Sequence, residues 1–378
     1  MTAVTRIGGQ STDFGSGMST AGESPRTVQV DLPCKWMLAG EYAVLSPRGL
    51  ALAVAVRPGF GLRLEPGAGS TFRPEGFEVL PRTAGPAGAA WPDFFLRAWS
   101  RAAARLPRGE RGKGPPGQIS TFFPASGGSF GPRPGSSAAL AVGTICALDA
   151  WWGLGLPAEL RLALARSAHA EAQGGGSGYD VNTIGLGGVV LTRASARSRP
   201  ESRPALPGIW LVCARAKEKT PTTRHLAAFA KALSRPPFRK ALSRHVRASN
   251  ALVRFLWSAA GRTQLPDRRQ RQDHVAPRPD FDLLARRVAA AEKTLRELSA
   301  LGRLGVFTPE VDAMLALARR LEQPARVSGG GGGDAVVAFA PDRDAAERLS
   351  AAFGAEGWPA ALLPPDSPCE GPKTLLVC

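Results

Sequence analysis

Three loops rich in glycine and serine each lie beside an apolar segment. The first covers residues 132–139 and reads Pro-Arg-Pro-Gly-Ser-Ser-Ala-Ala. Gly135 would let the backbone approach a phosphate, and a helix starting at Ser136 would offer free N–H groups and the positive end of its dipole. A serine hydroxyl here could also reach Mg²⁺. Many Gly-Ser helix starts are only capped turns, so the loop alone leaves both a nucleotide site and a simple turn open.

A second loop ends in an acidic residue. Residues 169–180 read His-Ala-Glu-Ala-Gln-Gly-Gly-Gly-Ser-Gly-Tyr-Asp. An acid that a glycine loop delivers at the end of a helix is well placed to face a substrate, although Asp after Gly is more often a cap or turn residue. We expect His169 to lie on a helix face, in water or half-packed, rather than to take part in catalysis.

A third loop and a lone lysine complete the set of candidates. Residues 328–334 contain five consecutive glycines closed by Asp334 and run directly into an apolar strand. This favours a bare backbone packed against another loop or a ligand over a flexible linker. Lys35 stands at the edge of an apolar strand just before Gly40-Glu41-Tyr42. A lysine there is normally on the surface, and it matters for chemistry only if the fold returns it to the phosphate loops.

The periodicity of apolar residues predicts alternating strands and helices around these loops. The segment 27–64 is strand-like, helices are expected at 136–152 and 157–173, and a strand at 188–192. After the polar, proline-containing segment 193–207, further strands are expected at 209–213 and 335–340 and in a final pair. Helices are expected at 224–233, 240–259, 281–301, 309–321 and 344–353.

The length of 378 residues suits two domains, which we place at 26–205 and 206–378. Residues 1–25 are rich in Gly, Ser and Thr, do not read as a secretory signal and are expected to be a disordered leader. No stretch approaches ~20 apolar residues, so no membrane span is expected. Five scattered cysteines, without metal-ligand spacing or a disulfide framework, fit a reducing cytoplasm.

The formal charge of +17 allows two classes of partner, a nucleic acid or a small anionic substrate. The densest basic cluster is Arg268, Arg269 and Arg271, in a segment without aromatic residues. A nucleic-acid groove usually combines basic residues with stacking aromatics, so a solvated surface is the better interpretation, and no nucleic-acid partner is expected.

Taken together, these segments resemble the signature regions of the GHMP kinases, the superfamily of galactokinase, homoserine kinase, mevalonate kinase and phosphomevalonate kinase. They occur in the family's order at residues 33–45, 135–139 and 328–334. The pattern at 168–181 and the tripeptide 307–309 are similar to the phosphomevalonate kinase branch, and Tyr42 stands where mevalonate kinases usually have histidine. Two departures are the Arg133-Pro134 pair before Gly135, where Gly-Leu-Gly is usual, and Cys34 in place of a glycine.

The resemblance implies an α/β (α+β) fold of two domains, the N-terminal one like ribosomal protein S5 domain 2 and the C-terminal one ferredoxin-like. ATP and Mg²⁺ would be the cofactors, and the acceptor would be 5-phosphomevalonate, with mevalonate kinase or a non-catalytic binding protein as alternatives. Lys35 would stabilise the transferring group, and Asp180 would orient the acceptor or hold a lysine. The remaining roles implied are contacts to the ATP phosphates by Arg133, Gly135, Ser136, Ser137 and Ala138, metal binding by Ser137 and Glu171, and substrate binding by Glu41, Tyr42, Ser177, Gly178, Thr222, Thr223, Arg224, Gly331 and Gly332. Relatives of this kind are monomers or homodimers.

Overall fold

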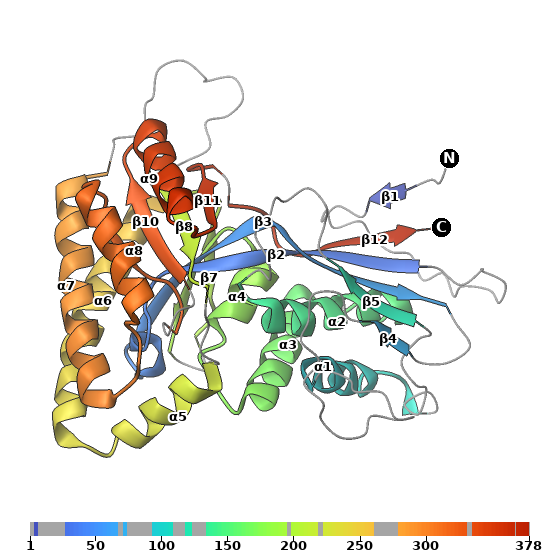
Figure 1. The fold of residues 1–378 in the computed structure, drawn as a ribbon. Helices are drawn as coiled ribbons and strands as arrows, with labels where there is room; N and C mark the ends of the chain where they lie inside the picture. The colour runs from blue at the N-terminus through green and yellow to red at the C-terminus, as the bar shows by residue number, and fades with distance from the viewer. Residues whose placement is uncertain are drawn as a thin grey trace.

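The computed structural model describes most of the chain as two sheets with helices packed around them (Figure 1). The described residues are 4–6, 27–66, 71–73, 93–108, 118–122, 134–194, 198–217, 222–260, 279–330, 335–366 and 368–377. The described elements form a mixed architecture of helices and two sheets, as the α/β (α+β) expectation from the sequence requires.

The larger sheet has eight strands and is built on two long antiparallel strands, β2 (Thr27–Ala39) and β3 (Leu50–Glu65). Its path continues through β5 (Gln118–Phe122) to β4 (Thr71–Arg73) on one side and through β12 (Lys373–Val377) to β1 (Val4–Arg6) on the other. A branch from β3 adds β6 (Val189–Arg193) and β7 (Glu201–Arg203).

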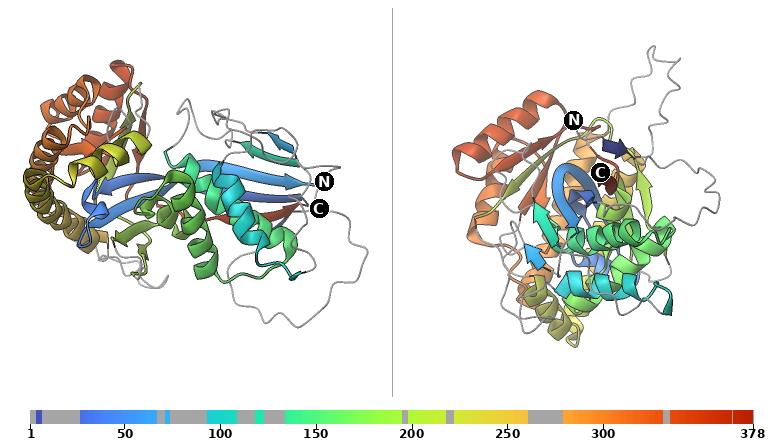
Figure 2. Two further views of the ribbon diagram at one scale, coloured as in Figure 1. Left: turned by 90° about the horizontal axis from the view of Figure 1, so that it is seen from below. Right: turned by 90° about the vertical axis from the view of Figure 1, so that its right-hand side faces the viewer.

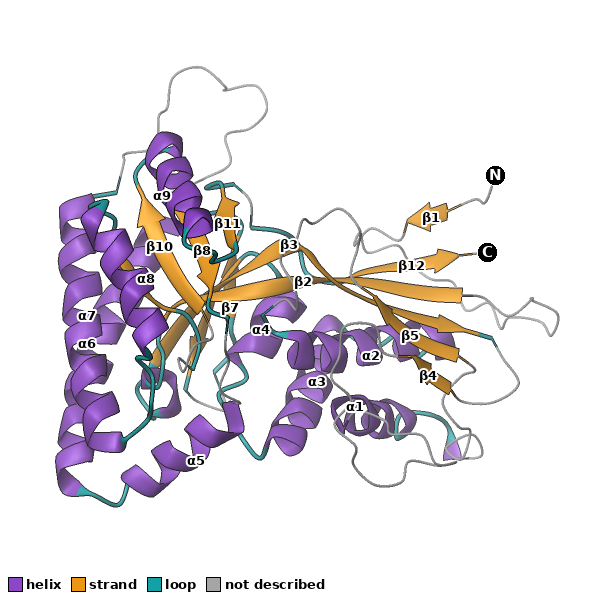
Figure 3. Cartoon of the chain, in the orientation of Figure 1, coloured by secondary structure: helices purple, strands orange, loops and turns teal. Residues whose placement is uncertain are grey.

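Four helices cover this sheet: α1 (Asp93–Ala103), α2 (Ser136–Trp152), α3 (Ala158–Gln173) and α4 (Tyr179–Leu186) (Figure 3). Helix α2 is buried without interruption from Ala138 to Asp149 and packs on both β2 and β3. Its alanine-rich sequence has no polar face, as expected of a helix in the interior of a domain. A core of valine, leucine and phenylalanine side chains from β2, β3 and these helices therefore holds the first turn of α2 in a fixed place.

The smaller sheet has the antiparallel order β11 (Ala360–Leu363), β8 (Trp210–Arg215), β10 (Ala335–Ala340) and β9 (Ala325–Val327). The helices around it are α5 (Thr222–Ala232), α6 (Pro236–Ala260), α7 (Phe281–Gly302), α8 (Pro309–Arg320) and α9 (Arg343–Ala355). One end of β2 and β3 shares a hydrophobic core with this sheet and with α6 and α7. The two long strands thus connect both parts of the molecule, and α6–α8 lie at the end remote from the labelled termini (Figure 2).

Most predicted elements are present within a few residues of their expected ends, but β4, α1, β5, β7 and α4 were not predicted, and two terminal segments differ from expectation. Helix α4 was not predicted, because eight residues after a glycine loop are too few to show helical periodicity. Strand β12 joins the larger sheet through β2, so the C-terminal segment does not stay with residues 206–378 as a separate unit. The expectation of a disordered leader is wrong for Val4–Arg6, which pairs with β12. The rest of 1–25 lies outside the described residues, and the boundary near 205 stays a prediction.

A buried histidine on α6 joins the two parts of the molecule. The Nε2 of His245 donates a hydrogen bond of 2.8 Å to the backbone carbonyl of Glu41, which fixes the neutral tautomer, and Nδ1 lies 3.0 Å from the hydroxyl of Thr294. Burial lowers the pKa of His245 to about 4, although its bond to Glu41 acts in the opposite direction. The charge of Arg326 also lowers this pKa.

We expect the free energy of unfolding to decrease as the pH falls from about 6.5 to about 4. In this window the unfolded chain binds a proton at His245, whose ordinary pKa is 6.5, while the folded chain does not. The full effect is roughly 3 kcal/mol, since each pKa unit is worth about 1.4 kcal/mol. Urea denaturation at pH 7 and pH 4.5 would measure it, and His245→Gln should show a smaller loss. An equal loss in both proteins would contradict the prediction.

Candidate active site

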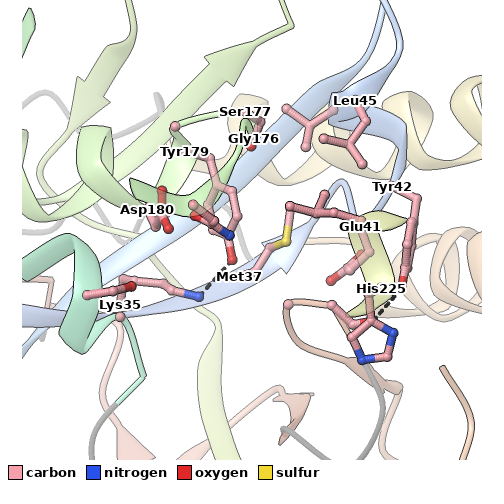
Figure 4. Close-up of a pocket in the computed structure, with 18 of the residues that line it drawn as sticks. Lys35, Met37, Glu41, Tyr42, Leu45, Gly176, Ser177, Tyr179, Asp180 and His225 are labelled. Atoms are coloured by element: carbon pink, nitrogen blue, oxygen red, sulfur yellow. Dashed lines mark hydrogen bonds between the residues drawn. The ribbon is translucent and has the colours of Figure 1, made fainter. Parts of the chain in front are cut away.

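The glycine loops and Lys35 meet around one cavity of about 910 Å³, part of which is open to solvent. Its walls come from β2, from the first turns of α2 and α4, from α5 and from the loop after β9 (Figure 4). The described residues that line it are Lys35, Met37, Glu41, Tyr42, Val44, Leu45, Gly135, Ser136, Ser137, Gln173, Gly176, Ser177, Gly178, Tyr179, Asp180, His225, Leu226, Gly329 and Gly330.

The first turn of α2 forms one wall of the cavity. Gly135 lies in the left-handed region with φ +94°, and Ser136 and Ser137 follow it into the helix. The preceding carbonyl, of Pro134, accepts a 3.2 Å hydrogen bond from the backbone N–H of Lys35, which ties this loop to β2. Free N–H groups at the start of a buried helix are a suitable site for an anion. Ala138 is buried behind the turn, and Arg133 lies outside the described residues.

Gly135→Ala is expected to reduce activity at least about a hundredfold. A Cβ at this position would come within 2.9 Å of Lys35 Cγ and 3.1 Å of Ile184 Cδ1, at a φ that side chains rarely adopt. The loop or the lysine must therefore move, and displacements of about 1 Å can cost about that much in rate. Gly153→Ala is the matched control, because Gly153 ends the same helix at φ +61° with open space around its Cβ position. Equal activity of the two variants would show that the contact with Lys35 does not matter.

The fold places Lys35 beside the loop that precedes α2. This proximity is the condition under which the sequence analysis gives Lys35 a chemical role. Its side chain is 7% exposed, and Nζ makes a 2.7 Å hydrogen bond with the hydroxyl of Tyr179 at the start of α4 (Figure 4). The register of β2 against β3 shifts on both sides of Lys35, between Leu32 and Cys34 and between Met37 and Ala39. Irregularities of this kind redirect side chains and are frequent next to active sites. The result is a primary amine beside the start of α2.

Asp180 lies in the first turn of α4 and lines the same cavity. Its Oδ1 accepts a 2.9 Å bond from the N–H of Val181, and its Oδ2 is 3.6 Å from Nε2 of His169. The prediction for His169 is wrong in one respect, because the ring is 3% exposed rather than half-packed or in water. Glycines before Asp180 allow α4 to start immediately after α3, which brings this carboxylate toward the cavity.

Glu41 and Tyr42 connect β2 to the C-terminal loop. The carboxylate of Glu41 is buried, pairs with Arg326 of β9 and also borders the cavity. Burial raises the pKa of this carboxyl even though Arg326 acts against the shift. The hydroxyl of Tyr42 donates a 2.6 Å bond to the carbonyl of Gly330, and burial raises the pKa of this phenol. Both residues therefore hold the cavity wall in place as well as lining it.

The described start of the loop after β9, residues 328–330, contacts β2 through the Ser328 side chain. Ser328 Oγ accepts from the N–H of Met37 at 3.0 Å and donates to its carbonyl at 2.9 Å. Gly329 and Gly330 then line the cavity. Gly331 and Gly332, two of the predicted substrate residues, lie outside the described residues.

The remaining predicted substrate residues divide between the cavity and the surface. Ser177 and Gly178 line the cavity. Thr222 and Thr223 begin α5, whereas Arg224 is exposed and is not among the lining residues described. The next residue, His225, was only a candidate by position, yet it faces the cavity and its Nδ1 donates to the carbonyl of Leu304 at 2.9 Å. Helical rotation separates neighbours by about 100°, so the sequence could not tell which of the two faces inward.

The prediction that Glu171 binds the metal is contradicted by its position. Glu171 makes ion pairs with Arg97 and Arg101 of α1, its side chain is 41% exposed, and it is not among the lining residues described. Two cations already neutralise this carboxylate on the outer face of α3, away from the start of α2.

The Ser137 hydroxyl and the Asp180 carboxylate are two of the oxygen donors that line the cavity and could contact Mg²⁺. Within the described part of the chain, no group of three or more His, Cys, Asp or Glu residues could hold a metal ion. Mg²⁺ usually keeps several waters and binds one or two carboxylates together with substrate phosphates. The Ser137 hydroxyl and the Asp180 carboxylate therefore fit a Mg²⁺ ion whose main protein-independent ligands are nucleotide phosphates and water.

Two family models match the chain in order. Residues 134–188 match the GHMP kinases N terminal domain and residues 279–360 match GHMP kinases C terminal. The chain therefore carries both GHMP kinase domains, which confirms the two-domain GHMP fold expected from the sequence. The N-terminal match spans both the first turn of α2 and the loop of Asp180. Among the helices described, none is both long and apolar enough to span a membrane.

The chain is similar to several individual proteins. The phosphomevalonate kinase of Streptomyces sp. (strain CL190) is 28% identical over 352 residues, covering 83% of this chain and 90% of that protein. The Lin0012 protein of Listeria innocua shares the fold with a TM-score of 0.71 at 20% identity, over 93% of this chain and 99% of that one. The structure of Streptococcus pneumoniae phosphomevalonate kinase in complex with phosphomevalonate and AMPPNP matches with a TM-score of 0.64 at 18% sequence identity. The match covers 89% of this chain and 99% of that one. The structure of L. major mevalonate kinase in complex with R-mevalonate matches with a TM-score of 0.62 at 18% sequence identity. The match covers 93% of this chain and 96% of that one.

Proposed function

We propose that the protein transfers the γ-phosphate of ATP to 5-phosphomevalonate and releases 5-diphosphomevalonate and ADP. The observation that carries this proposal is the position of the Lys35 amine, which lies in the cavity between the phosphate-binding start of α2 and the loop of Asp180. The relative that is 28% identical is a phosphomevalonate kinase, which supports the same acceptor.

In this proposal ATP lies with its phosphates at the first turn of α2, within the region 26–205. Gly135 leaves room for the phosphates, and the N–H groups and hydroxyls of Ser136 and Ser137 bind them. When bound, Mg²⁺ would neutralise charge on the β- and γ-phosphates, and Ser137 and Asp180 are the side chains placed to help hold it. Glu41, Tyr42, Ser177 and Gly178 border the space left for the acceptor.

The acceptor chemistry explains why a lysine is central. A phosphomonoester carries close to two negative charges at pH 7, with its second pKa near ~6, so it can attack without losing a proton. An oxygen of the acceptor phosphate forms the new bond to the γ-phosphorus, and the bond from that phosphorus to the ADP oxygen breaks. Two anions must approach each other, and Lys35 reduces their repulsion.

A second candidate is mevalonate as the acceptor, favoured by the carboxylate of Asp180 in the same cavity. A hydroxyl is a poor nucleophile and needs a base within hydrogen-bond reach, a task that Asp180 could take. The fold is shared with a mevalonate kinase to a similar degree, so fold alone does not separate the two acceptors.

ADP release with MgATP and, separately, (R)-mevalonate, 5-phosphomevalonate, 5-diphosphomevalonate and homoserine would test the proposal. Turnover on 5-phosphomevalonate alone is the expected result. Turnover only on mevalonate would move the enzyme one reaction upstream. Folded protein that is inactive with every acceptor would support a non-catalytic GHMP-fold protein instead.

The proposal includes a cytoplasmic location. Cys146 and Cys213 are buried thiols that form no disulfide with another described residue, and burial raises the pKa of Cys146 to about 11. Buried thiols of this kind are inert, and unpaired cysteines are the norm in a reducing compartment.

A further inference from the structure

His169 is a buried residue at the active site that has no place in the mechanism above. It lies near the end of α3 with 3% of its surface exposed. Its ring packs on Phe94 of α1, with ring centroids 5.0 Å apart and planes at 31°. Packing from two helices therefore fixes the ring plane and the direction of its nitrogens.

One ring nitrogen of His169 faces two candidate active-site residues at once. Nε2 lies 3.2 Å from Ser137 Oγ and 3.6 Å from Asp180 Oδ2. Ser137 is in the first turn of α2 and Asp180 is in the first turn of α4. The imidazole is thus the point at which three helices meet behind the cavity.

The partners define the direction of these contacts. The Ser137 hydroxyl can donate to or accept from Nε2, whereas a carboxylate oxygen only accepts, so the tautomer with its proton on Nε2 is the one that suits both partners. The same N–H is then directed between the Ser137 hydroxyl oxygen and the Asp180 carboxylate. With Nε2–H as the donor, the serine keeps its own proton and remaining lone pair for groups in the cavity.

We propose that His169 is a positioning residue that holds the Ser137 hydroxyl and the Asp180 carboxylate in fixed positions relative to each other. The nucleotide bound near Ser137 and the acceptor bound near Asp180 are thereby aligned for transfer. This inference rests on the proposed kinase function for its kinetic part only. His169 is placed to act through Ser137 and Asp180 and does not line the cavity among the described residues.

Three single variants separate this role from simple packing. His169→Leu keeps an apolar side chain of similar bulk against Phe94 but removes the donor. His169→Gln can place an amide N–H near the position of Nε2. Phe94→Leu loosens the ring contact and leaves the donor in place. Circular dichroism and thermal unfolding would first establish that each variant is folded.

His169→Leu is expected to lower kcat about 30- to 100-fold and to change the KM for the acceptor less than about threefold, because alignment rather than acceptor affinity is lost. His169→Gln should recover at least about tenfold of that loss, and Phe94→Leu should stay within about threefold of the wild type. Equal damage from His169→Leu and Phe94→Leu, or wild-type kinetics for His169→Leu, would overturn the inference.

Binding of AMPPNP with Mg²⁺, measured by calorimetry, gives a readout that does not depend on the acceptor. His169→Leu should weaken binding roughly fivefold, Ser137→Ala should weaken it too, and the double variant should be no weaker than Ser137→Ala alone. Additive losses would contradict coupling through Ser137. If the wild type turns over none of the acceptors but shows this coupling, the proposed function fails while the role of His169 stands. If His169→Leu does not fold, AMPPNP binding is measured instead for His169→Gln, alone and combined with Ser137→Ala. Binding by His169→Gln close to that of the wild type would support the inference, and a full fivefold loss would oppose it.

Discussion

Lys35→Ala is expected to lower kcat on 5-phosphomevalonate by about a thousandfold, and by more than Asp180→Asn does. Lys35 is 7% exposed, so its amine acts in a site that is mostly shielded from solvent. Removing one preorganised donor from such a site costs about 10²–10³ in rate, and a full positive charge between two phosphates is worth more than a neutral donor. Steady-state kinetics with MgATP and 5-phosphomevalonate measure both variants.

Asp180→Asn serves as the comparison because it keeps the shape of the side chain and the 2.9 Å acceptor for the N–H of Val181. A phosphate dianion does not need a base, so this change should cost about 10- to 100-fold through weaker metal binding and orientation. Lys35→Arg retains charge but not the compact geometry of an ammonium, and it should be intermediate. If Asp180→Asn proves more damaging than Lys35→Ala, proton removal matters and mevalonate becomes the better acceptor.

Arg326→Met is expected to destabilise the protein by roughly 3–5 kcal/mol. Arg326 of β9 is fully buried and pairs with Glu41, so the variant leaves a carboxylate in the interior without its cation. Breaking a buried pair on one side usually costs about this much, although replacing both members can be nearly neutral. Urea denaturation at pH 7 measures the loss.

The double variant Glu41→Gln with Arg326→Met is the matched control for this pair, and it should recover a large part of the stability. Arg193→Ala removes an exposed ion pair with Glu201 and should change stability by less than about 1 kcal/mol. A loss for Arg326→Met no larger than that for Arg193→Ala would show that the buried pair contributes little.

The loops around the cavity could be predicted because glycine and serine have few other reasons to gather beside apolar elements. Gly135, Ser136 and Ser137 line the cavity as expected, and so do Gly178 and Asp180. These residues act through backbone shape and position next to a helix start, and both properties are visible in the local sequence.

Helix orientation could not be predicted in the same way. His169 and Glu171 are two positions apart on α3, so their side chains point about 200° apart around the helix. The sequence alone gave no reason to prefer either, and the metal role was assigned to Glu171. Only the position of α1, whose Arg97 and Arg101 hold Glu171 and whose Phe94 packs on His169, decides which one faces the active site.

Long-range pairing was also beyond the sequence. Glu41 and Arg326 are ordinary charged residues in sequence, and their pairing follows from the contact between β2 and the smaller sheet. The same holds for β12, whose short apolar pattern says nothing of its partner.

The position of β12 has a consequence for how the chain folds during synthesis. Strand β2 is among the first parts of the described chain to leave the ribosome, whereas its neighbour β12 is among the last. The smaller sheet and its helices can therefore assemble while one side of β2 still has no partner. An unpaired strand edge is a template for association with other chains, so nascent or truncated chains that lack residues 373–377 should aggregate more readily than the full-length protein.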